Sequence, residues 1–302
     1  MKILMTGASG FIGQQLIKRF SGMENMQIAV LTRNANSKNN YKKNQIAEYK
    51  WDVDQNFIDD SSMDGVDVII HLAGEPVFDG RWTRNKKDKI YKSRVNGTKL
   101  LVEAINQRPT KNIRLISTSA IGYYASNQAD EITEISGPGC DFLAKVCIDW
   151  EEQAMRHPKT CIVRTGMVLG NEGGALKKMR TPFELGLGGP LGEGKQYMSW
   201  IHIDDLVEIY CWLINHDDQM GVFNAVAPTP VTNYEFTKVL GKFLKRPTIL
   251  RVPVSILKKV LGEQSSLLLN SQKVVPKRLL DEGFIFKAKD INDCLRQLLI
   301  GF

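Results

Sequence analysis

The chain has 302 residues, of which 43% are hydrophobic and 24% are charged, enough to bury a large core in one domain or in two closely joined ones. Its 40 Lys and Arg residues outnumber 33 Asp and Glu residues, giving a net charge of +7, but they are spread along the chain rather than gathered in a stripe with aromatic residues, so no nucleic-acid partner is expected. No run reaches the roughly 18 apolar residues of a membrane span, and the first strand begins too early to leave room for a signal peptide, so we expect a cytoplasmic protein with no membrane partner.

The cysteines and histidines predict no metal centre. The five cysteines are odd in number and contain no C-x-x-C pair, which is typical of reduced thiols in the cytoplasm. The four histidines are scattered and show no spacing typical of metal ligands.

Strand and helix signals alternate over the first half of the chain. Runs rich in Val, Ile or Leu predict strands at residues 2–6, 27–32, 46–50, 66–71, 112–118 and 160–165. Helical patterns lie between several of them, at 11–21, 85–108 and 140–156. This alternation predicts the α/β class with a doubly wound parallel Rossmann sheet, whose ligands lie at the carboxyl ends of the strands.

The second half of the chain is organised differently. It has a glycine-rich loop at 186–194, a strand and helix at 199–216, and helical patterns at 232–245 and 253–283. We therefore expect a cofactor-binding Rossmann domain and a smaller, substrate-binding C-terminal lobe. The Rossmann domain comprises residues 1–166 and 198–227, and the lobe comprises residues 167–197 and 228–302.

The segment directly after the first strand gives the strongest site signal. Gly7 permits a sharp turn, Gly10 lets the backbone approach phosphates, and Gly13 lets the next helix pack closely on the strand. The free N–H groups and positive end of helix 11–21 then face an anion. The pattern predicts a seat for a dinucleotide pyrophosphate, formed by Gly7, Ser9, Gly10, Phe11, Ile12 and Gly13.

The end of the second strand distinguishes between the two nicotinamide dinucleotides. An NAD site usually carries Asp or Glu here, about 20 residues after the glycine turn, to bind the ribose hydroxyls. This strand ends instead with Thr32 and Arg33. A guanidinium suits the 2′-phosphate of NADP(H), which is therefore the expected cofactor, with an ordinary solvated charge at Arg33 as the alternative. Lys38, Lys42 and Lys43 either assist Arg33 or belong to a solvated loop.

Further motifs give the chain a family resemblance. They are HLAGEP at residues 71–76, SAIGYY at 119–124, RTGMVLG at 164–170, MSWIHIDD at 198–205 and QKVVPKRL at 272–279. With the glycine turn, they make the chain resemble the extended short-chain dehydrogenase/reductase superfamily. Within that superfamily it is most similar to the atypical NAD-dependent epimerase/dehydratase-like branch called epimerase family protein, which has its own C-terminal module. The resemblance covers essentially all 302 residues.

The resemblance implies further cofactor contacts at the ends of later strands. Residues 52–53 would meet the adenine, residues 72–74 the ribose and phosphate, and residues 165–168 the nicotinamide amide. An exposed loop carboxylate at Asp52 and a charged helix face at Arg94 are alternatives. The residues implied are Asp52, Val53, Leu72, Ala73, Gly74, Arg94, Ser117, Lys145, Arg164, Thr165 and Gly166.

The catalytic residues of the superfamily are only partly present. The superfamily uses Tyr-x-x-x-Lys on a helix, whereas this chain has Asp141 four residues before Lys145. A free Asp has a pKa of about 3.9 and Lys145 would lower it, so an ion pair between Asp141 and Lys145 is expected rather than an acid. The resemblance leaves Ser119 at the substrate-hydroxyl position, Lys145 at the nicotinamide ribose, and Tyr123 as a candidate proton donor. A loop cap at Ser119 and packing of the tyrosines are the alternatives.

Residues after the fourth and fifth strands are candidates for the substrate site. Glu75, Arg81, Trp82 and Tyr124 are expected to line it, with simple packing as the alternative. Two other stretches favour structural roles. His202 is expected to bond the backbone and Asp204 to cap the helix that follows. The basic residues 272–279 form either an anion clamp or a solvated helix face.

These observations predict an NADP(H)-binding oxidoreductase or nucleotide-sugar-epimerase-like enzyme. It would act on an unidentified small molecule as a monomer or homodimer. Because the usual catalytic tyrosine is missing, the alternative is a non-catalytic NADP(H)-responsive regulatory protein, linked to cell division as some relatives of this branch are.

Overall fold

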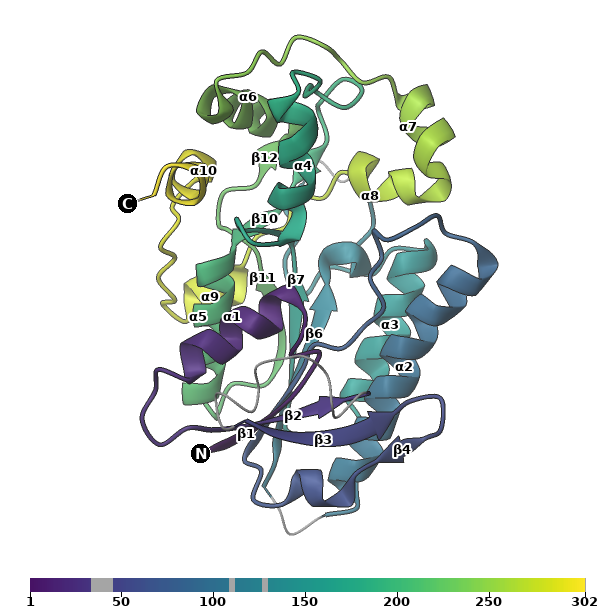
Figure 1. Ribbon diagram of the computed structural model, residues 1–302, viewed down its shortest axis with the longest axis vertical. Helices are drawn as coiled ribbons and strands as arrows, with labels where there is room; N and C mark the ends of the chain where they lie inside the picture. The colour runs from purple at the N-terminus through teal and green to yellow at the C-terminus, as the bar shows by residue number, and fades with distance from the viewer. Residues whose placement is uncertain (34–45, 109–111, 127–129, 302) are drawn as a thin grey trace.

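The computed structural model describes residues 1–33, 46–108, 112–126 and 130–301, and its centre is an eight-stranded sheet (Figure 1). The strand order is β11-β7-β6-β5-β1-β2-β3-β4, and neighbours pair in parallel except for the antiparallel pair β3–β4. The chain winds outward from β1 in both directions, so the predicted doubly wound Rossmann fold is confirmed. The strands are Lys2–Thr6 (β1), Gln27–Thr32 (β2), Ala47–Asp52 (β3), Phe57–Ile58 (β4), Val68–His71 (β5), Arg114–Ala120 (β6), Thr160–Thr165 (β7) and Gly221–Ala225 (β11).

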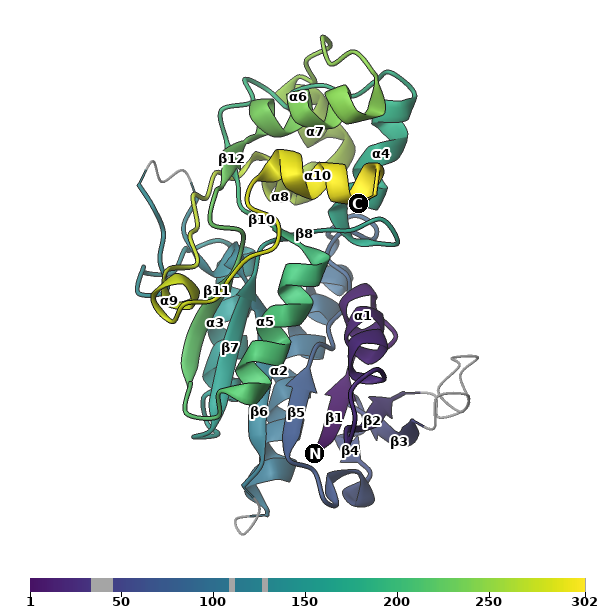
Figure 2. The same ribbon diagram turned by 90° about the vertical axis from the view of Figure 1, so that its left-hand side faces the viewer.

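Helices cover both faces of this sheet. The helices α1 (Phe11–Phe20) and α5 (Ile203–Asn215) lie on one face, and α2 (Arg84–Asn106) and α3 (Phe142–Ala154) lie on the other (Figures 1 and 2). Side chains of β1 alternate between the two cores, because successive residues of a strand point to opposite faces. Ile3 and Met5 pack with α1 and α5, whereas Leu4 packs with α2, and all three are completely buried.

A smaller group of elements forms a lobe beyond the carboxyl ends of the strands, at the top of Figure 2. Its core contains Leu176, Trp200, Phe236 and Leu295. Its helices are Gly174–Glu184 (α4), Asn233–Leu244 (α6), Val254–Leu261 (α7), Ser266–Leu269 (α8) and Ile291–Leu299 (α10). Its short strands are Met167–Leu169 (β8), Tyr197–Met198 (β9), Trp200–His202 (β10) and Val231–Thr232 (β12). The lobe also contains the 3₁₀ turn Gly262–Ser265 (η4), whereas the turns Asp60–Met63 (η2) and Ile121–Tyr123 (η3) belong to the Rossmann part of the chain.

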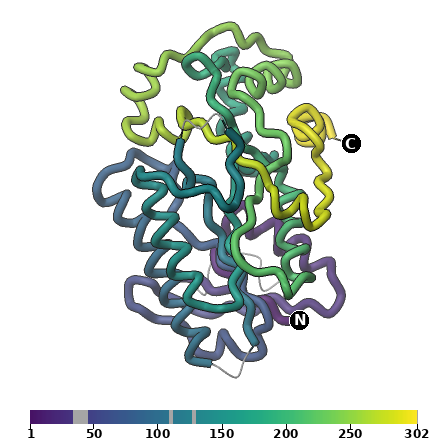
Figure 3. The backbone as a smooth tube through the Cα atoms, turned by 180° about the vertical axis from the view of Figure 1, so that it is seen from behind, coloured from purple at the N-terminus to yellow at the C-terminus, as the bar shows by residue number. Residues whose placement is uncertain are grey.

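The tail is not the helical stretch predicted over residues 253–283. The helix α7 ends at Gly262, which has a φ of +61°. Residues 270–276 then run extended beside Ile132, whose N–H donates to Lys273 O (2.8 Å) and whose carbonyl accepts from Val275 N (2.9 Å). The chain reaches α9 (Lys277–Asp281) beside β11 and returns to the lobe as α10 (Figure 3). The prediction was wrong because a helical pattern does not reveal pairing with a distant segment.

Two further features concern membranes and cysteines. Across the described ranges, no helix combines the length and the apolarity needed to cross a bilayer. The five cysteines are free thiols, and all but Cys140 are buried.

Candidate functional site

Three glycines shape the turn between β1 and α1, and they do so for different reasons. Gly7 has a φ of +65°, and a Cβ there would lie 2.7 Å from the carbonyl carbon of Leu72. A Cβ on Gly13 would lie 2.6 Å from the carbonyl oxygen of Gly7. On Gly10 a Cβ would meet only that same oxygen, at 3.2 Å. The protein's own packing therefore requires Gly7 and Gly13, whereas the space beside Gly10 is open to a ligand.

The first turn of α1 offers unpaired backbone donors. The N-cap residue is Gly10, no side chain caps the helix, and no acidic residue lies in its first turn. The N–H groups of Phe11, Ile12 and Gly13 therefore point out of the helix together with the positive end of its dipole. The Phe11 ring packs on the loop before α4, where a Cβ on Gly173 would lie 2.5 Å from ring atoms. The unpaired N–H groups at the start of α1 provide the geometry that an anion-binding site requires.

Buried hydrogen bonds hold the ends of β1 and β5 together. The Thr6 hydroxyl accepts from the N–H groups of Leu72 and Ala73, both at 3.1 Å, and donates to Nδ1 of His71 at 2.7 Å. On the other side of the ring, Nε2 of His71 donates to the Thr98 hydroxyl (2.9 Å), which donates to a carbonyl of α2. In this series of hydrogen bonds, each hydroxyl and each ring nitrogen has a partner only if the His71 imidazole is neutral. His71 therefore positions the backbone that follows β5.

We expect stability to depend on pH through His71. Burial and the charge of Arg94 lower the pKa of His71 to about 4 from an ordinary 6.5. The unfolded chain binds the proton more readily, so this contribution is fully present above pH 6.5 and is lost as the pH falls towards 4. From this group alone, the free energy of unfolding should fall by about 2 kcal/mol between pH 7.5 and pH 5.0.

Urea unfolding at the two pH values checks this expectation. The variant His71→Asn should lack the decrease in the free energy of unfolding that arises from His71, whatever its stability at pH 7.5. An equal fall in the parent and the variant would contradict the assignment. His216→Asn, an exposed position, serves as the control and should behave like the parent.

Arg94 lies directly against the loop that follows β5. Its Nη1 donates to the carbonyl of Glu75 (2.9 Å), and a Cβ on Gly74 would lie 3.0 Å from its Cζ. Its guanidinium also lies 5.3 Å from the ring centroid of Trp150. The side chain thus supports the backbone of residues 72–74 and places a positive charge behind it. Direct contact of Arg94 with the cofactor stays a prediction.

The ends of β2 and β3 border the same edge of the sheet. Arg33 is exposed immediately after β2, and Thr32 is half-buried. The Asp52 carboxylate accepts from the N–H groups of Asp54 (3.0 Å) and Gln55 (3.2 Å), so it closes the turn after β3. The three lysines predicted either to assist Arg33 or to form a solvated loop, Lys38, Lys42 and Lys43, lie outside the described residues.

Ser119 and Arg164 belong to a buried network. The Ser119 hydroxyl donates to Oε1 of Glu151 at 2.6 Å, and the residue is 2% exposed. Arg164 donates twice to the same carboxylate, from Nε to Oε1 (2.9 Å) and from Nη2 to Oε2 (2.7 Å). These charge-assisted bonds offset the cost of burying the pair. The Ser119 and Arg164 side chains, which were predicted to contact substrate and cofactor, instead form buried hydrogen bonds with Glu151.

The two adjacent tyrosines differ in exposure. The Tyr124 hydroxyl donates to Oδ1 of Asn224 (2.7 Å) and accepts from Nη1 of Arg164 (2.9 Å), and burial raises its pKa to about 12. Its predicted place beside the substrate is wrong, because the residue is 2% exposed and its hydroxyl is satisfied internally. Tyr123 is only half-buried. Its ring centroid lies 3.4 Å from Cζ of Arg164, and its ring packs edge-on against Tyr124.

The predicted ion pair at the start of α3 is wrong. Asp141 is the N-cap of the helix, and its Oδ1 accepts from Ala144 N (2.9 Å). Lys145 instead pairs with Asp149, one turn further along, at 3.1 Å. An N-cap carboxylate faces the unpaired N–H groups of its own helix, which compete with the lysine. The Lys145 side chain is 71% exposed and so remains accessible to a ligand.

Two other stretches have structural roles. His202, rather than Asp204, caps α5, since Nδ1 of His202 accepts from Asp204 N at 3.0 Å. The predicted cap at Asp204 is therefore wrong. In the basic stretch 272–279, Arg278 donates to the carbonyls of Met220 (3.0 Å) and Val222 (2.8 Å). Arg278 thus fastens the tail to the edge of the sheet.

The remaining predicted cofactor residues present little side-chain surface. A Cβ on Gly166 would lie 2.6 Å from the carbonyl oxygen of Ser199, so this glycine permits close packing of the segment before β10. Thr165 is 8% exposed and donates to Val163 O (3.3 Å), and Ser117 is completely buried in β6. Contacts of these residues with a nicotinamide would have to involve backbone atoms, and they stay predictions.

Three predicted substrate residues lie in the loop between β5 and α2. Glu75 pairs with Lys86 (2.7 Å), and Nε1 of Trp82 donates to a carbonyl of its own loop. Arg81 is exposed, and its Nη2 lies 3.4 Å from the carbonyl oxygen of Lys259 in α7. This loop therefore contacts the lobe, but none of the three residues lines the lobe cavity.

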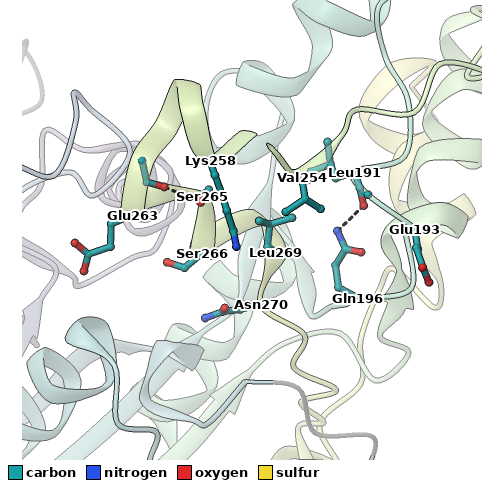
Figure 4. A pocket seen from close by; sticks show the side chains of 12 residues that line it. Leu191, Glu193, Gln196, Val254, Lys258, Glu263, Ser265, Ser266, Leu269 and Asn270 are labelled. Atoms are coloured by element: carbon teal, nitrogen blue, oxygen red, sulfur yellow. Dashed lines mark hydrogen bonds between the residues drawn. The ribbon is translucent and has the colours of Figure 1, made fainter. Parts of the chain in front are cut away.

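That cavity has a volume of about 680 Å³ and lies between residues 191–196 and the segment α7–η4–α8 (Figure 4). Two hydrogen bonds tie its walls to the Rossmann domain. Nδ2 of Asn270 donates to Oδ2 of Asp141 (3.4 Å), and Nε2 of Gln264 donates to Val77 O (2.7 Å). No sequence motif revealed the cavity, because its walls come from separate segments of the chain.

The fold and the glycine turn define a Rossmann-fold protein of the extended short-chain dehydrogenase/reductase type. Comparison with known proteins narrows this class. The chain belongs to the NAD dependent epimerase/dehydratase family, whose family profile matches residues 3–226. Residues 252–298 match a domain of unknown function, DUF1731. The resemblance inferred from the motifs is thereby confirmed.

Individual relatives cover nearly the whole chain. It is 38% identical to the chloroplastic epimerase family protein SDR39U1 homolog of Arabidopsis thaliana, over 99% of this chain and 87% of that protein. It is 33% identical to epimerase family protein SERP0438 of Staphylococcus epidermidis, over 99% of both. Its structure is similar to that of human epimerase family protein SDR39U1 (isoform 2) with NADPH, with a TM-score of 0.87 and 30% identity over 100% of both chains.

Proposed function

We propose that the chain is an NADP(H)-dependent oxidoreductase or nucleotide-sugar-epimerase-like enzyme that acts on a small molecule. The observation that carries this proposal is the uncapped start of α1 beside the open space at Gly10, together with the exposed Arg33 after β2. Membership of the epimerase/dehydratase family supports it. The human relative solved with NADPH supports the choice of dinucleotide.

The residues present fit this cofactor. The N–H groups of α1 would hold the pyrophosphate, Arg33 the 2′-phosphate, and Lys145 the nicotinamide ribose. Bound NADP(H) supplies hydride transfer at its nicotinamide. The full assignment, by backbone or side chain, is Gly7, Ser9, Gly10, Phe11, Ile12, Gly13, Thr32, Arg33, Asp52, Val53, Leu72, Ala73, Gly74, Arg94, Ser117, Lys145, Thr165 and Gly166.

Tyr123 is the proton donor in this proposal. Its half-buried ring is held against the Arg164 guanidinium, which Glu151 in turn fixes with two hydrogen bonds. Ser119 donates to the same carboxylate. Ser119 and Arg164 therefore act as positioning residues, and Tyr123 is the group that meets the substrate. The lobe of residues 167–197 and 228–302 supplies the substrate site.

Transfer of a deuterium label tests the proposal. The protein is incubated with NADPH deuterated at the transferable position and with a metabolite extract, and products are examined by mass spectrometry. Label in a product supports an enzyme. Tyr123→Phe should slow the transfer while leaving NADPH affinity unchanged, because it removes only the hydroxyl.

Binding of NADPH without label transfer to any product would favour the alternative, a non-catalytic NADP(H)-responsive regulator. The observation that favours this alternative is that Asp141, four residues before Lys145, is occupied as a helix cap. In this alternative Asp141 takes the place that the family resemblance gives to the superfamily's tyrosine. A cytoplasmic location and a monomeric or homodimeric state stay predictions, and the Arabidopsis relative is named as chloroplastic.

A further inference from the structure

The cavity in the lobe combines an apolar wall with polar groups. Leu191, Val254 and Leu269 supply the apolar side chains, and Ser266 and Asn270 supply hydrogen-bonding groups. A volume of about 680 Å³ lies within the range of roughly 300–1,000 Å³ that small-molecule sites occupy. The cavity is therefore large enough for a metabolite with both apolar and polar parts.

The charged side chains that line the cavity differ in whether they have an ion-pair partner. Glu193 pairs with Lys195 at 2.7 Å, and Glu263 pairs with Lys87. In the part of the chain that the structure describes, no acidic side chain forms an ion pair with Lys258. Figure 4 shows the Lys258 ammonium extending between Ser266 and Leu269 towards Asn270, whereas the two glutamates lie at opposite sides of the view. Lys258, an exposed residue of α7, is thus the lining cation that is left to attract an anionic ligand.

The cavity adjoins the proposed catalytic residues. Asn270, in its wall, lies 3.4 Å from the Asp141 carboxylate, which caps the helix that carries Lys145 one turn later. Two residues beyond Asn270, Nε2 of Gln272 donates to the carbonyl of Ile121 (3.2 Å), in the same 3₁₀ turn as Tyr123. A molecule bound in the cavity would therefore lie close to the groups assigned to chemistry.

We propose that this cavity is the substrate site and that it takes a small organic oxyanion, a carboxylate or a phosphate monoester, attached to an apolar portion. Lys258 is the specificity-determining residue that binds the oxyanion, with Ser266 and Asn270 as hydrogen-bond donors. The apolar portion packs on Leu191, Val254 and Leu269. This inference rests on the proposed function, which it extends by naming the substrate class.

Binding of defined probes to the full chain tests the inference. The probes are 3-phenylpropanoate, phenyl phosphate and neutral 3-phenylpropan-1-ol, measured by calorimetry or ligand-observed NMR with and without saturating NADPH. At least one anion should bind about 10-fold or more tightly than the alcohol, consistent with a charge-assisted bond. Preference for the carboxylate or for the phosphate each supports the site and identifies which oxyanion it takes.

A matched pair of variants locates the effect. Lys258→Met should remove the preference for the anion, whereas Lys259→Met, the exposed neighbour that does not line the cavity, should leave it intact. No binding of either anion, equal binding of anion and alcohol, or equal effects of the two variants would overturn the inference. NADPH affinity is measured separately in each variant. A parent that binds NADPH but shows no preference for the anion overturns only the substrate class, whereas a parent that does not bind NADPH overturns the proposed function.

Discussion

Gly10→Ala is expected to weaken NADPH binding by about 100-fold, or ~2.7 kcal/mol, while the protein remains nearly as stable as the parent. The φ of −74° and ψ of 169° at Gly10 suit alanine, and the new Cβ would meet only the Gly7 oxygen, at 3.2 Å. The loss of affinity arises because the methyl group occupies the space through which a phosphate approaches the first N–H groups of α1. Fluorescence titration with NADPH and thermal unfolding measure the two quantities.

Gly13→Ala is the control for the stability measurement. Unlike Gly10→Ala, it should lower the stability of the folded protein. Its Cβ would lie 2.6 Å from the Gly7 oxygen and 2.7 Å from Cα of Ala8, which are backbone atoms. Such overpacking should lower the free energy of unfolding by about 1–3 kcal/mol. A Gly10→Ala protein that binds NADPH as tightly as the parent would show that no phosphate lies at this turn.

Arg33→Ala is expected to weaken NADPH binding by about 10–100-fold, the worth of charge-assisted hydrogen bonds to one phosphate. Affinity for NADH should change by less than about 2-fold, because NADH lacks the 2′-phosphate. The parent should accordingly prefer NADPH. Titration of both dinucleotides against parent and variant gives the four affinities required.

Arg84→Ala provides the matched control for this experiment. Arg84 is an exposed arginine at the start of α2, so its loss removes the same charge from another part of the surface. Both dinucleotides should bind this variant as they bind the parent. Equal affinities of the parent for NADPH and NADH would remove the argument from Arg33.

Local patterns predicted the features that depend on neighbouring residues. The strand Lys2–Thr6, the turn at Gly7 and the start of α1 at Phe11 appear where the sequence predicts them. Each follows from nearby residues alone, because an apolar run favours a strand and glycine is favoured where φ is positive. The six strands predicted between residues 2 and 165 and the helices between them appear in the predicted order for the same reason, and they give the fold class, whereas β4 and β11 of the sheet were not predicted.

The failures involve competition between partners. Asp141 and Lys145 have suitable spacing for an ion pair, but the helix N–H groups take the aspartate. Residues 270–276 carry a helical pattern, but they hydrogen-bond to Ile132 far earlier in the chain. Tyr124 was expected to line the substrate site, with packing as the alternative, but Asn224 and Arg164 enclose its hydroxyl. Sequence spacing shows which pairs are possible and does not show which partner is nearer in the fold.

The sequence by itself determined the fold class, the glycine turn and the family, because these depend on short-range backbone geometry and on motifs that remain contiguous. Only the tertiary structure decided which side chains remain accessible. It buried Ser119 and Arg164 around Glu151, left Tyr123 half-exposed, and assembled the lobe cavity from residues 191–196 and the segment α7–η4–α8. The physical reason is that burial and electrostatic pairing depend on distances in space between residues remote along the chain.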